Sequence, residues 1–269
     1  MTTDLSAVDF SRLGPPEGFR LVVTGGCGGI GRRLVEVALE SGVKVAVLDL
    51  PASLERHGVP DGVLPVEMDA KDDASTKAAF AKVGAAWDGA IDGLVHLPGF
   101  MNRHTTVEDL SMDEIDEVLS VNLRSAFSTV HAALPMMRKA GGGSTVLTAS
   151  GLATLVEKGT GTYSAAKAGI IALAKGLAKE NAPDMRFNCI APGAVDTAFL
   201  RGGTGRGGDD ANDVNFTGDM DKSKMLATIP LGRIAVVEDV IGPILFLLGD
   251  KSRFMTGQTL YINGGRLMV

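Results

Sequence analysis

Seven short apolar segments alternate along the chain with longer stretches of helical periodicity, and this alternation restricts the folds that the chain can adopt. Several of the apolar segments are nearly continuous runs of Val, Leu and Ile, which is typical of strands covered on both faces. Strands separated by helices form βαβ units, so the pattern predicts an α/β fold with a doubly wound seven-stranded parallel sheet. The expected strands are 20–24, 44–49, 63–68, 91–96, 144–149, 185–191 and 258–263, and the expected helices are about 30–42, 72–86, 111–139, 163–181 and 237–249.

The domain organisation follows from the same pass along the chain. No change of composition divides it, so we expect one α/β domain over residues 19–269. Residues 1–18 are polar, carry Gly14-Pro15-Pro16 near their end, and are expected to form an N-terminal arm outside the core. A substrate loop is expected at about 198–228, because residues 201–221 are rich in Gly and Asp without apolar periodicity, and such long loops are usually functional or disordered.

Charge and cysteine content narrow the partners and the compartment. The formal net charge of −6 argues against nucleic acid or an anionic membrane as the main partner. No segment approaches the roughly 18 apolar residues of a membrane helix, and the N-terminus lacks the basic and apolar regions of a signal peptide. Two cysteines do not make a disulfide framework in a chain this long, so we expect a reducing, cytoplasmic location.

The stretch TGGCGGIG, residues 24–31, follows the first expected strand and opens the first expected helix. Glycines there let the backbone turn tightly and approach a phosphate, which the N–H groups and dipole of the helix N-terminus then attract. The stretch fits G-x-G-x-x-G through Gly26, Gly28 and Gly31, and equally G-x-x-x-G-x-G through Gly25, Gly29 and Gly31. It therefore predicts a dinucleotide site without fixing which glycines matter. A tight structural turn is the alternative.

Asp49 ends the second expected strand, 18 residues after Gly31. A carboxylate there can accept hydrogen bonds from both ribose hydroxyls of an adenosine and would repel a 2′-phosphate. Neither Leu50 nor Gly28 is basic, so no group near Asp49 is expected to hold such a phosphate. The sequence favours NAD over NADP, and Cys27 within the turn is expected to pack rather than to react.

A candidate catalytic group follows the fifth expected strand and consists of Ser150, Tyr163 and Lys167. Tyr163 and Lys167 are four residues apart, so on a helix they lie on one face, and the ammonium is expected to lower the pKa of the phenol. A tyrosine shifted in this way can act as a general acid or base. Ser150 lies where the strand ends, at the edge where ligands bind in doubly wound sheets. An incidental Tyr/Lys pair and a serine that caps the next turn are the structural alternatives.

Asn122 is an unexpected polar residue in the predicted helix 111–139, whose start carries the capping-box residues Ser111 and Glu114. Its apolar neighbours Val118, Leu119 and Ala126 place it on the face that should be buried, where an amide needs hydrogen-bond partners. A helix-kinking residue satisfied by water is the alternative interpretation.

Taken together, these motifs resemble the short-chain dehydrogenase/reductase family in its compact single-domain form, with a Rossmann fold. The resemblance covers about residues 19–265 and rests on the order and spacing of its motifs. They are Thr24-Gly25-x-x-x-Gly29-x-Gly31, Asp49, Asp69, Asn122, Ser150, Tyr163-x-x-x-Lys167, Pro192-Gly193 with Thr197, and the late GQTLYINGG. The resemblance implies that G-x-x-x-G-x-G is the register in use.

The resemblance also implies roles for these residues. Tyr163 would be the acid/base on the substrate oxygen, Ser150 would orient that oxygen, and Lys167 would lower the pKa of Tyr163 and bind the nicotinamide ribose. Asn122 would hold a water between Lys167 and solvent. The cofactor residues would be Gly25, Cys27, Gly28, Gly29, Ile30, Gly31, Asp49, Leu50, Asp69, Ala70, Leu97, Pro98, Gly99, Tyr163, Lys167, Pro192, Gly193, Val195 and Thr197, with Asp69 and Ala70 at the adenine. Phe100, Met101, Leu152, Phe199 and Leu200 would lie near the substrate pocket, which suggests an apolar or cyclic substrate, with no metal involved. Arg103, Glu157 and the loop 201–221 could contribute charge there.

One segment departs from the family pattern. After the fourth strand the family usually carries Asn-Asn-Ala-Gly, whereas this chain has His96-Leu97-Pro98-Gly99. The hydrogen bonds that the first Asn gives to the sheet must therefore be replaced or lost. His96 at this position fits a core histidine with satisfied hydrogen bonds better than a catalytic base.

The predicted function is a reversible, NAD(H)-dependent hydride transfer between a secondary alcohol and a ketone. The alternatives are an epimerase of the same fold that uses NAD transiently, a non-catalytic nucleotide-sensing module and a purely structural subunit; the last two are disfavoured by the intact Asn, Ser, Tyr and Lys set. The resemblance implies a small-molecule alcohol or ketone substrate and a homodimer or homotetramer paired through the helices 111–139 and 163–181.

Overall fold

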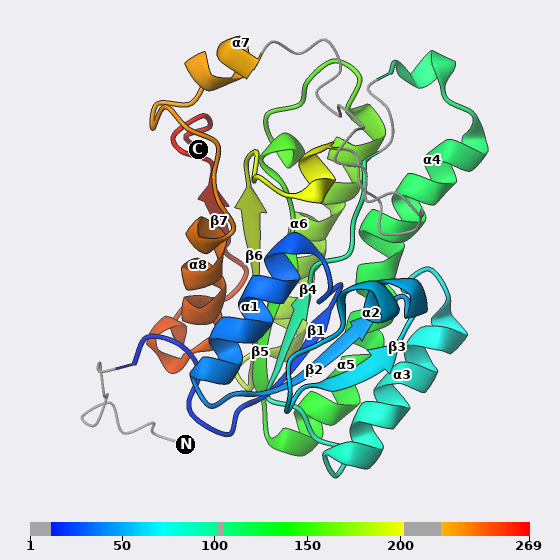
Figure 1. The fold of residues 1–269 in the computed structure, drawn as a ribbon, viewed down its shortest axis with the longest axis vertical. Helices are drawn as coiled ribbons and strands as arrows, with labels where there is room; N and C mark the ends of the chain where they lie inside the picture. The colour runs from blue at the N-terminus through cyan, green and yellow to red at the C-terminus, as the bar shows by residue number, and fades with distance from the viewer. Residues whose placement is uncertain (1–11, 102–104, 202–221) are drawn as a thin grey trace.

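The computed structural model describes residues 12–101, 105–201 and 222–269. Its strands form one parallel sheet in the order β3-β2-β1-β4-β5-β6-β7 (Figure 1). The strands are β1 (Arg20–Thr24), β2 (Lys44–Asp49), β3 (Leu64–Glu67), β4 (Gly93–His96), β5 (Gly143–Thr148), β6 (Met185–Pro192) and β7 (Thr259–Ile262). The predicted seven-stranded parallel sheet is confirmed, and the predicted strand ends differ from these by two residues at most.

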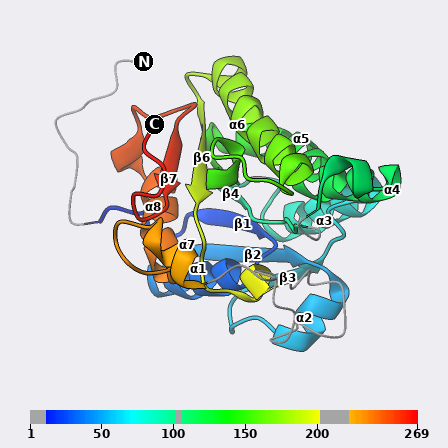
Figure 2. The same ribbon diagram turned by 90° about the horizontal axis from the view of Figure 1, so that it is seen from above.

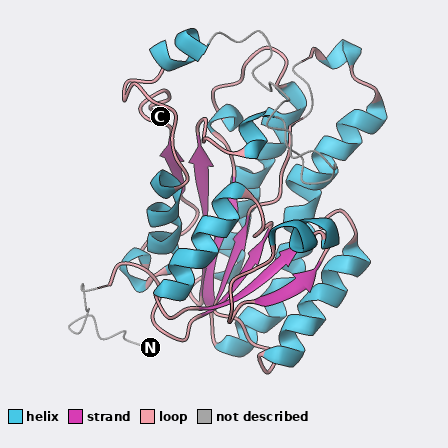
Figure 3. Cartoon of the chain, viewed as in Figure 1, coloured by secondary structure: helices cyan, strands magenta, loops and turns pink. Residues whose placement is uncertain are grey.

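Helices cover both faces of the sheet, as Figures 2 and 3 show. The helices are α1 (Gly29–Glu40), α2 (Pro51–His57), α3 (Asp73–Ala86), α4 (Met112–Leu119), α5 (Ser125–Ala140), α6 (Gly161–Asn181), α7 (Lys222–Ala227) and α8 (Glu238–Leu248). Short helical turns are η1 (Val107–Asp109), η2 (Ser120–Arg124), η3 (Gly151–Ala153), η4 (Ala198–Arg201) and η5 (Asp250–Ser252). One face packs against α1 and α8, and the other against α3, α5 and α6.

The strands supply both halves of the core because alternate side chains point to opposite faces. In β1, Leu21 and Val23 pack with the α1 and α8 side, whereas Val22 packs with the other side. Each of these three side chains is fully buried. Burial of an aliphatic side chain of this size contributes about 1.5–3 kcal/mol, which explains why both faces of the central strands are apolar.

The predicted helix 111–139 exists but is not uniform. It begins with the predicted capping box, in which Ser111 and Glu114 each bond the other's backbone N–H, and ends at Gly141 with φ +88°. Between α4 and α5 the chain stays helical but widens into one π-helical turn, η2, which carries Asn122. Single π turns of this kind are frequent at functional sites.

Several parts differ from the sequence-based expectations. Helices α2 and α7 were not predicted, and α7 lies within the segment 198–228 that was expected to be a loop. The short helical turns outside 111–139 were not predicted either. Of the expected arm, residues 12–18 lie against the body of the protein: Arg12 Nη1 donates to the Ser41 carbonyl at 2.8 Å, and Gly18 N donates to the Gly42 carbonyl at 2.8 Å. Residues 1–11, Arg103 and most of the glycine-rich loop 201–221 lie outside the described residues. In the described parts, no helix is long and apolar enough to cross a membrane.

The sheet order creates the place for a ligand. The chain moves outward from β1 through β2 to β3, then returns to the other side of β1 with β4. Ligands of doubly wound folds bind where this direction changes, beyond the carboxyl ends of the strands. Thr24 and His96 are neighbours at that edge, in the register of β1 and β4.

Candidate active site

A cavity of about 750 Å³ lies at this edge of the sheet and runs from the glycine turn to the segment that follows β6. The glycine turn lies between β1 and α1, with Gly28 as the residue before the first helical turn. A side chain at Gly25, which has φ +72°, would come within 3.0 Å of Pro98 N. At Gly29 a Cβ would lie 2.8 Å from Thr197 Cγ2, and at Gly31 it would lie 2.6 Å from the Gly25 carbonyl. Each glycine of G-x-x-x-G-x-G is therefore in a contact too close for a side chain.

The two remaining glycines of the turn differ from each other. A Cβ at Gly26 would lie 2.8 Å from Val47 Cγ1, so this glycine lets the turn pack on β2. At Gly28 the nearest atom would be 3.4 Å away, which is an ordinary contact. Gly28, the middle glycine of the G-x-G-x-x-G spacing, thus has room for a side chain. The sequence alone did not explain why the turn has a glycine at positions 26 and 28.

Asp49 and Cys27 meet at one end of the cavity. Asp49 Oδ2 accepts from Cys27 N at 2.8 Å, and Oδ1 accepts from Leu50 N at 2.8 Å. Burial raises the pKa of Asp49, and these two backbone hydrogen bonds oppose the increase. Burial and the neighbouring Asp49 raise the pKa of the Cys27 thiol to about 12. The thiol is therefore protonated and buried, which fits the expected packing role.

Two basic side chains that the cofactor prediction did not consider, those of Arg32 and His57, line the same cavity as Asp49. Arg32, one residue beyond the last glycine, lines the same cavity, and its Nη1 lies 2.8 Å from His57 Nδ1. His57 ends α2 and also lines the cavity. The sequence-based search considered only positions 28 and 50. It missed His57 because α2 itself was not predicted.

Ser150, Tyr163 and Lys167 line the centre of the cavity and are almost fully buried. Ser150 follows β5, and its hydroxyl accepts from Leu152 N at 3.2 Å while also bonding Tyr163. It thus caps the next turn, as the structural alternative held, and contacts the phenol as well. Lys167 lies one turn after Tyr163 on α6, with Nζ 5.7 Å from the centre of the Tyr163 ring.

Burial dominates the protonation of this group. It raises the pKa of Tyr163 to about 12, and the hydrogen bond with Ser150 acts in the opposite direction. It also lowers the pKa of Lys167 to about 8. The expected net lowering of the Tyr163 pKa by Lys167 is therefore not found. Removing the phenolate from water destabilises it by more than the neighbouring groups stabilise it. Lys167 Nζ donates to the Thr148 carbonyl at 2.9 Å.

Asn122 lies behind this group rather than in the cavity wall. Its Nδ2 donates to the carbonyls of Phe100 at 2.7 Å and Val118 at 2.9 Å. Its buried Oδ1 has no hydrogen-bond partner within the described ranges. A Cβ at Gly99 would lie 2.7 Å from this oxygen and 3.1 Å from Lys167 Nζ, so the absence of a side chain at Gly99 keeps the space between them open. An unpartnered acceptor beside an ammonium fits a position for a bridging water.

His96 takes over the role of a hydrogen-bonding core residue. It is 1% exposed, and its two ring nitrogens contact the hydroxyls of Thr24 and Ser125. Burial, together with the nearby Lys167, lowers its pKa to about 3, so the ring is neutral. His96 does not line the cavity.

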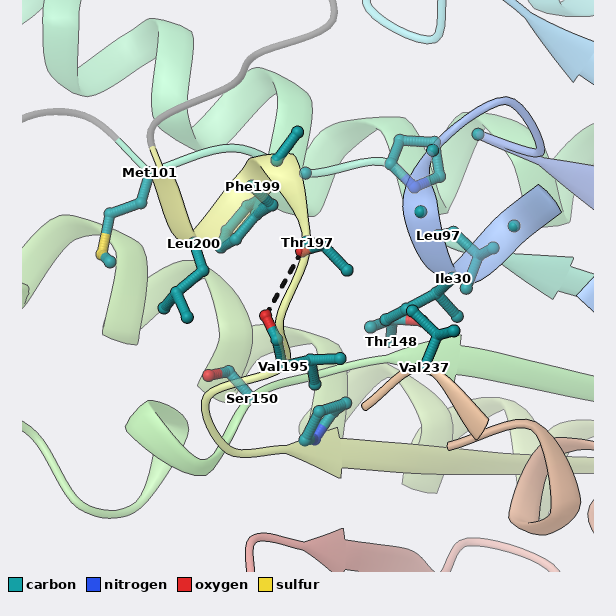
Figure 4. Close-up of a pocket in the computed structure, with 18 of the residues that line it drawn as sticks. Ile30, Leu97, Met101, Thr148, Ser150, Val195, Thr197, Phe199, Leu200 and Val237 are labelled. Carbon is teal, nitrogen blue, oxygen red and sulfur yellow. Dashed lines mark hydrogen bonds between the residues drawn. The ribbon is translucent and has the colours of Figure 1, made fainter. Parts of the chain in front are cut away.

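The far end of the cavity is apolar. Met101, Phe199 and Leu200 gather there on one side of Ser150, whereas Ile30, Leu97 and Val237 lie toward the glycine turn (Figure 4). Thr197 Oγ1 lies 3.4 Å from the Val195 carbonyl, drawn as the dashed line in Figure 4. The Phe199 and Tyr163 rings are 6.2 Å apart. Met225 also lines the cavity and was absent from the predicted site residues.

Most of the predicted site residues lie in the wall of this one cavity, and three do not. Asn122 is behind it, as described above. Asp69 accepts from Lys71 N at 2.9 Å in a turn, while its neighbours Met68 and Ala70 line the cavity. Phe100 contributes its carbonyl to Asn122, and Met101 rather than Phe100 faces the cavity. No group of metal-binding side chains was found among the described residues.

The fold and the site together define a nucleotide-binding α/β protein with a serine, tyrosine and lysine at the switch point of its sheet. The chain belongs to the short-chain dehydrogenase/reductase family, whose members are oxidoreductases that use a nicotinamide cofactor. Residues 25–266 match the family model described as enoyl-(acyl carrier protein) reductase.

Individual relatives agree with this assignment over nearly the whole chain. The chain is 33% identical to a 3-oxoacyl-(acyl-carrier-protein) reductase of Chlamydia pneumoniae, over 92% of this chain and 96% of that protein. It is 34% identical to a probable galactose dehydrogenase of Rhizobium meliloti, over 91% and 93%. Among solved structures, the aldohexose dehydrogenase of Thermoplasma acidophilum is similar, with a TM-score of 0.81 and 26% identity, covering 93% of this chain and 94% of that one.

Proposed function

We propose that this protein is an NAD(H)-dependent oxidoreductase that interconverts a secondary alcohol and a ketone by hydride transfer. One observation carries the proposal: Ser150, Tyr163 and Lys167 line the same cavity as the glycine turn and Asp49. A nucleotide-binding end and an acid/base end are thereby joined in one space. The words reductase and dehydrogenase in the names of the relatives support an oxidoreductase.

The cofactor-binding part of the proposal assigns each end of the cavity. The first-turn N–H groups of α1 would face the pyrophosphate, since the glycine turn has no side chains in the way. Asp49 would accept from the adenosine ribose, and Lys167 would bind the nicotinamide ribose. Leu97, Pro98, Gly99, Pro192, Gly193, Val195 and Thr197 would line the nicotinamide end. When bound, the nicotinamide ring accepts or donates the hydride.

The proton would be handled by Tyr163. With its pKa raised to about 12, the hydroxyl is protonated near neutral pH, as donation to the oxygen of a ketone requires. Alcohol oxidation requires the phenolate, which the hydrogen bond with Ser150 favours. The space between Asn122 Oδ1 and Lys167 would let a water carry the proton onward.

The experiment is a panel of secondary alcohols with NAD, and of the matching ketones with NADH, followed at 340 nm as the optical readout. Tyr163→Phe should lower kcat by about 10²–10⁴-fold, the usual contribution of a positioned acid/base. Tyr261→Phe is the matched control, because Tyr261 bonds Thr154 and does not line the cavity. Near-normal turnover of Tyr163→Phe would overturn the proposal, and product formation without net NADH would point to an epimerase.

The remaining expectations also stand as proposals. We infer a single dehydrogenase domain over residues 19–269, located in the cytoplasm, where the two free cysteines stay reduced. We also infer a homodimer or homotetramer paired through α4, α5 and α6. Phe127 on α5 is 52% exposed and Met112 on α4 is 66% exposed, as apolar residues at a subunit contact would be in one isolated chain. Light scattering after size exclusion would measure the number of subunits.

A further inference from the structure

A pair of opposite charges lies in the wall of the cavity. Arg266 Nη2 contacts Glu157 Oε1, and both residues line the cavity. Glu157 lies in the segment that joins Ser150 to Tyr163, and Arg266 follows β7. The pair is therefore built from two distant parts of the sequence, and one of its members belongs to the same connection as the catalytic serine and tyrosine.

The backbone at Glu157 is held by hydrogen bonds to the start of α6. Glu157 N donates to Thr160 Oγ1 at 3.2 Å, and the same hydroxyl donates to the Glu157 carbonyl at 2.8 Å. Thr160 is 2% exposed and also contacts Ser164, one residue after Tyr163. The backbone at Glu157 is thus attached, through a buried threonine, to the helix that carries the acid/base residue, and the carboxylate itself contacts Arg266.

Arg266 is held by a turn after β7. Its backbone N–H donates to the Asn263 carbonyl at 3.2 Å, while Asn263 Nδ2 donates to the Leu267 carbonyl at 3.0 Å. The tyrosine of β7, Tyr261, bonds Thr154 at 2.8 Å on the segment that carries Glu157. The backbone of Arg266 is therefore held in a turn after β7, while its side chain contacts Glu157.

The pair retains hydrogen-bonding capacity toward the cavity. The side chains are 19% exposed for Arg266 and 30% exposed for Glu157, and the contact between them uses one guanidinium nitrogen and one carboxylate oxygen. An arginine carries five N–H donors and a carboxylate accepts several hydrogen bonds, so both can bind further groups. The wall of the same cavity also carries apolar side chains: Leu152, Leu155, Phe199, Leu200 and Leu267.

We propose that this ion pair binds hydroxyl groups of the substrate, and that the substrate is a neutral polyhydroxylated ring, a sugar or a cyclic polyol. This inference rests on the proposed function, since it names the substrate class of the same site. A hydroxyl both donates and accepts, so it can bond the carboxylate and the guanidinium at once. The apolar side chains would pack against the C–H face of the ring.

The same geometry disfavours the other substrate classes. An anionic group that bonds Arg266 would also lie beside the negatively charged Glu157 carboxylate, which repels it. A cationic group that approaches Glu157 would lie beside the positively charged Arg266, which repels it. A purely apolar ring would bury part of the ion pair without replacing its water, which costs free energy.

The test compares probes that share a ring and a secondary alcohol and differ in their other groups. These are D-glucose, D-galactose, myo-inositol, cyclohexanol and quinate, each assayed with NAD for kcat and KM. We expect at least one of the three polyhydroxylated probes to exceed both cyclohexanol and quinate in kcat/KM by about tenfold or more, the usual effect of a hydrogen bond to a charged group. A preference for cyclohexanol or quinate would overturn the inference while leaving the proposed function in place. Turnover of no alcohol or ketone at all would overturn the proposed function itself.

A variant then connects the preference to the pair. Glu157→Gln should lower kcat/KM for the polyhydroxylated probe by about 10-fold or more, mainly through KM, and should raise quinate relative to it because Arg266 becomes an uncompensated cation. Glu36→Gln, on the exposed pair that Glu36 forms with Arg33, is the control and should change none of these values. An equal loss on every probe in Glu157→Gln would show a structural role and overturn the assignment. The wild-type ranking still tests the substrate class if that variant does not fold.

Discussion

His96 Nε2 lies 3.1 Å from the hydroxyl of Ser125, a contact that joins the end of β4 to the start of α5. Ser125 itself donates to the Val121 carbonyl at 2.5 Å, so it accepts the proton of the ring. Nδ1 is then the acceptor for the Thr24 hydroxyl, 2.9 Å away. The histidine therefore holds β1, β4 and the π turn of Asn122 together, in the place where the family usually has an asparagine.

The first prediction is an acid-dependent loss of stability at His96. Its pKa is about 3 in the folded chain and about 6.5 when unfolded, so between these values the unfolded chain binds the extra proton. The contribution of this group to the free energy of unfolding is fully present above pH 6.5. It falls as the pH decreases toward 3, by at most about 1.4 kcal/mol per pH unit. Urea unfolding at pH 7 and pH 5 should show a smaller loss for His96→Asn than for the wild type. Equal losses would contradict the assignment.

The second prediction concerns the cofactor. With Asp49 as the acceptor for ribose hydroxyls, NAD should be used at least tenfold better than NADP, and Asp49→Ser should remove most of this preference. Arg32→Ala is the necessary comparison, because Arg32 lines the same end of the cavity. We expect Arg32→Ala to change kcat/KM for NAD by less than about threefold, because the Arg32 guanidinium is engaged with the His57 ring. A wild-type preference for NADP that disappears in Arg32→Ala would reverse the cofactor assignment.

The third prediction uses two glycines of the same turn as a matched pair. Gly31→Ala would place a Cβ 2.6 Å from the Gly25 carbonyl, so it should destabilise the fold by about 1–3 kcal/mol and weaken NAD binding. Gly28→Ala has its nearest contact at 3.4 Å and should be tolerated. Chemical unfolding and calorimetric titration with NAD measure both effects. Similar behaviour of the two variants would mean that the packing of the turn does not set the register.

The fourth prediction separates stability from activity at Lys167. Burial lowers its pKa to about 8, so near neutral pH the chain carries a buried ammonium that favours unfolding. The unfolded chain binds more protons between pH 8 and about 10.5, so this cost is largest below that window and declines as the pH rises through it. Lys167→Met should raise the midpoint of thermal unfolding at pH 7 and abolish turnover. Lys175→Met, an exposed position of the same helix, should change neither.

The parts of the fold that follow from local pattern could be predicted from the sequence. The seven strands are short apolar runs, and Tyr163 and Lys167 share a helical face because they are four residues apart. Other features depend on contacts between distant residues. Arg32 meets His57 only because α2 folds back toward α1, and Glu157 meets Arg266 across 109 residues of sequence. The raised pKa of Tyr163 depends on burial by the folded chain, which spacing does not reveal.

The contact between Gly25 and Pro98 has a consequence for how this site can vary. The two residues come from turns on either side of the switch point, and any side chain at position 25 would collide with the proline backbone 3.0 Å away. The two turns therefore pack directly against each other and cannot change independently. Substitutions at these positions should be strongly non-additive, as expected for residues in contact. A redesign of the cofactor specificity of this enzyme would have to exchange both turns as a single cassette.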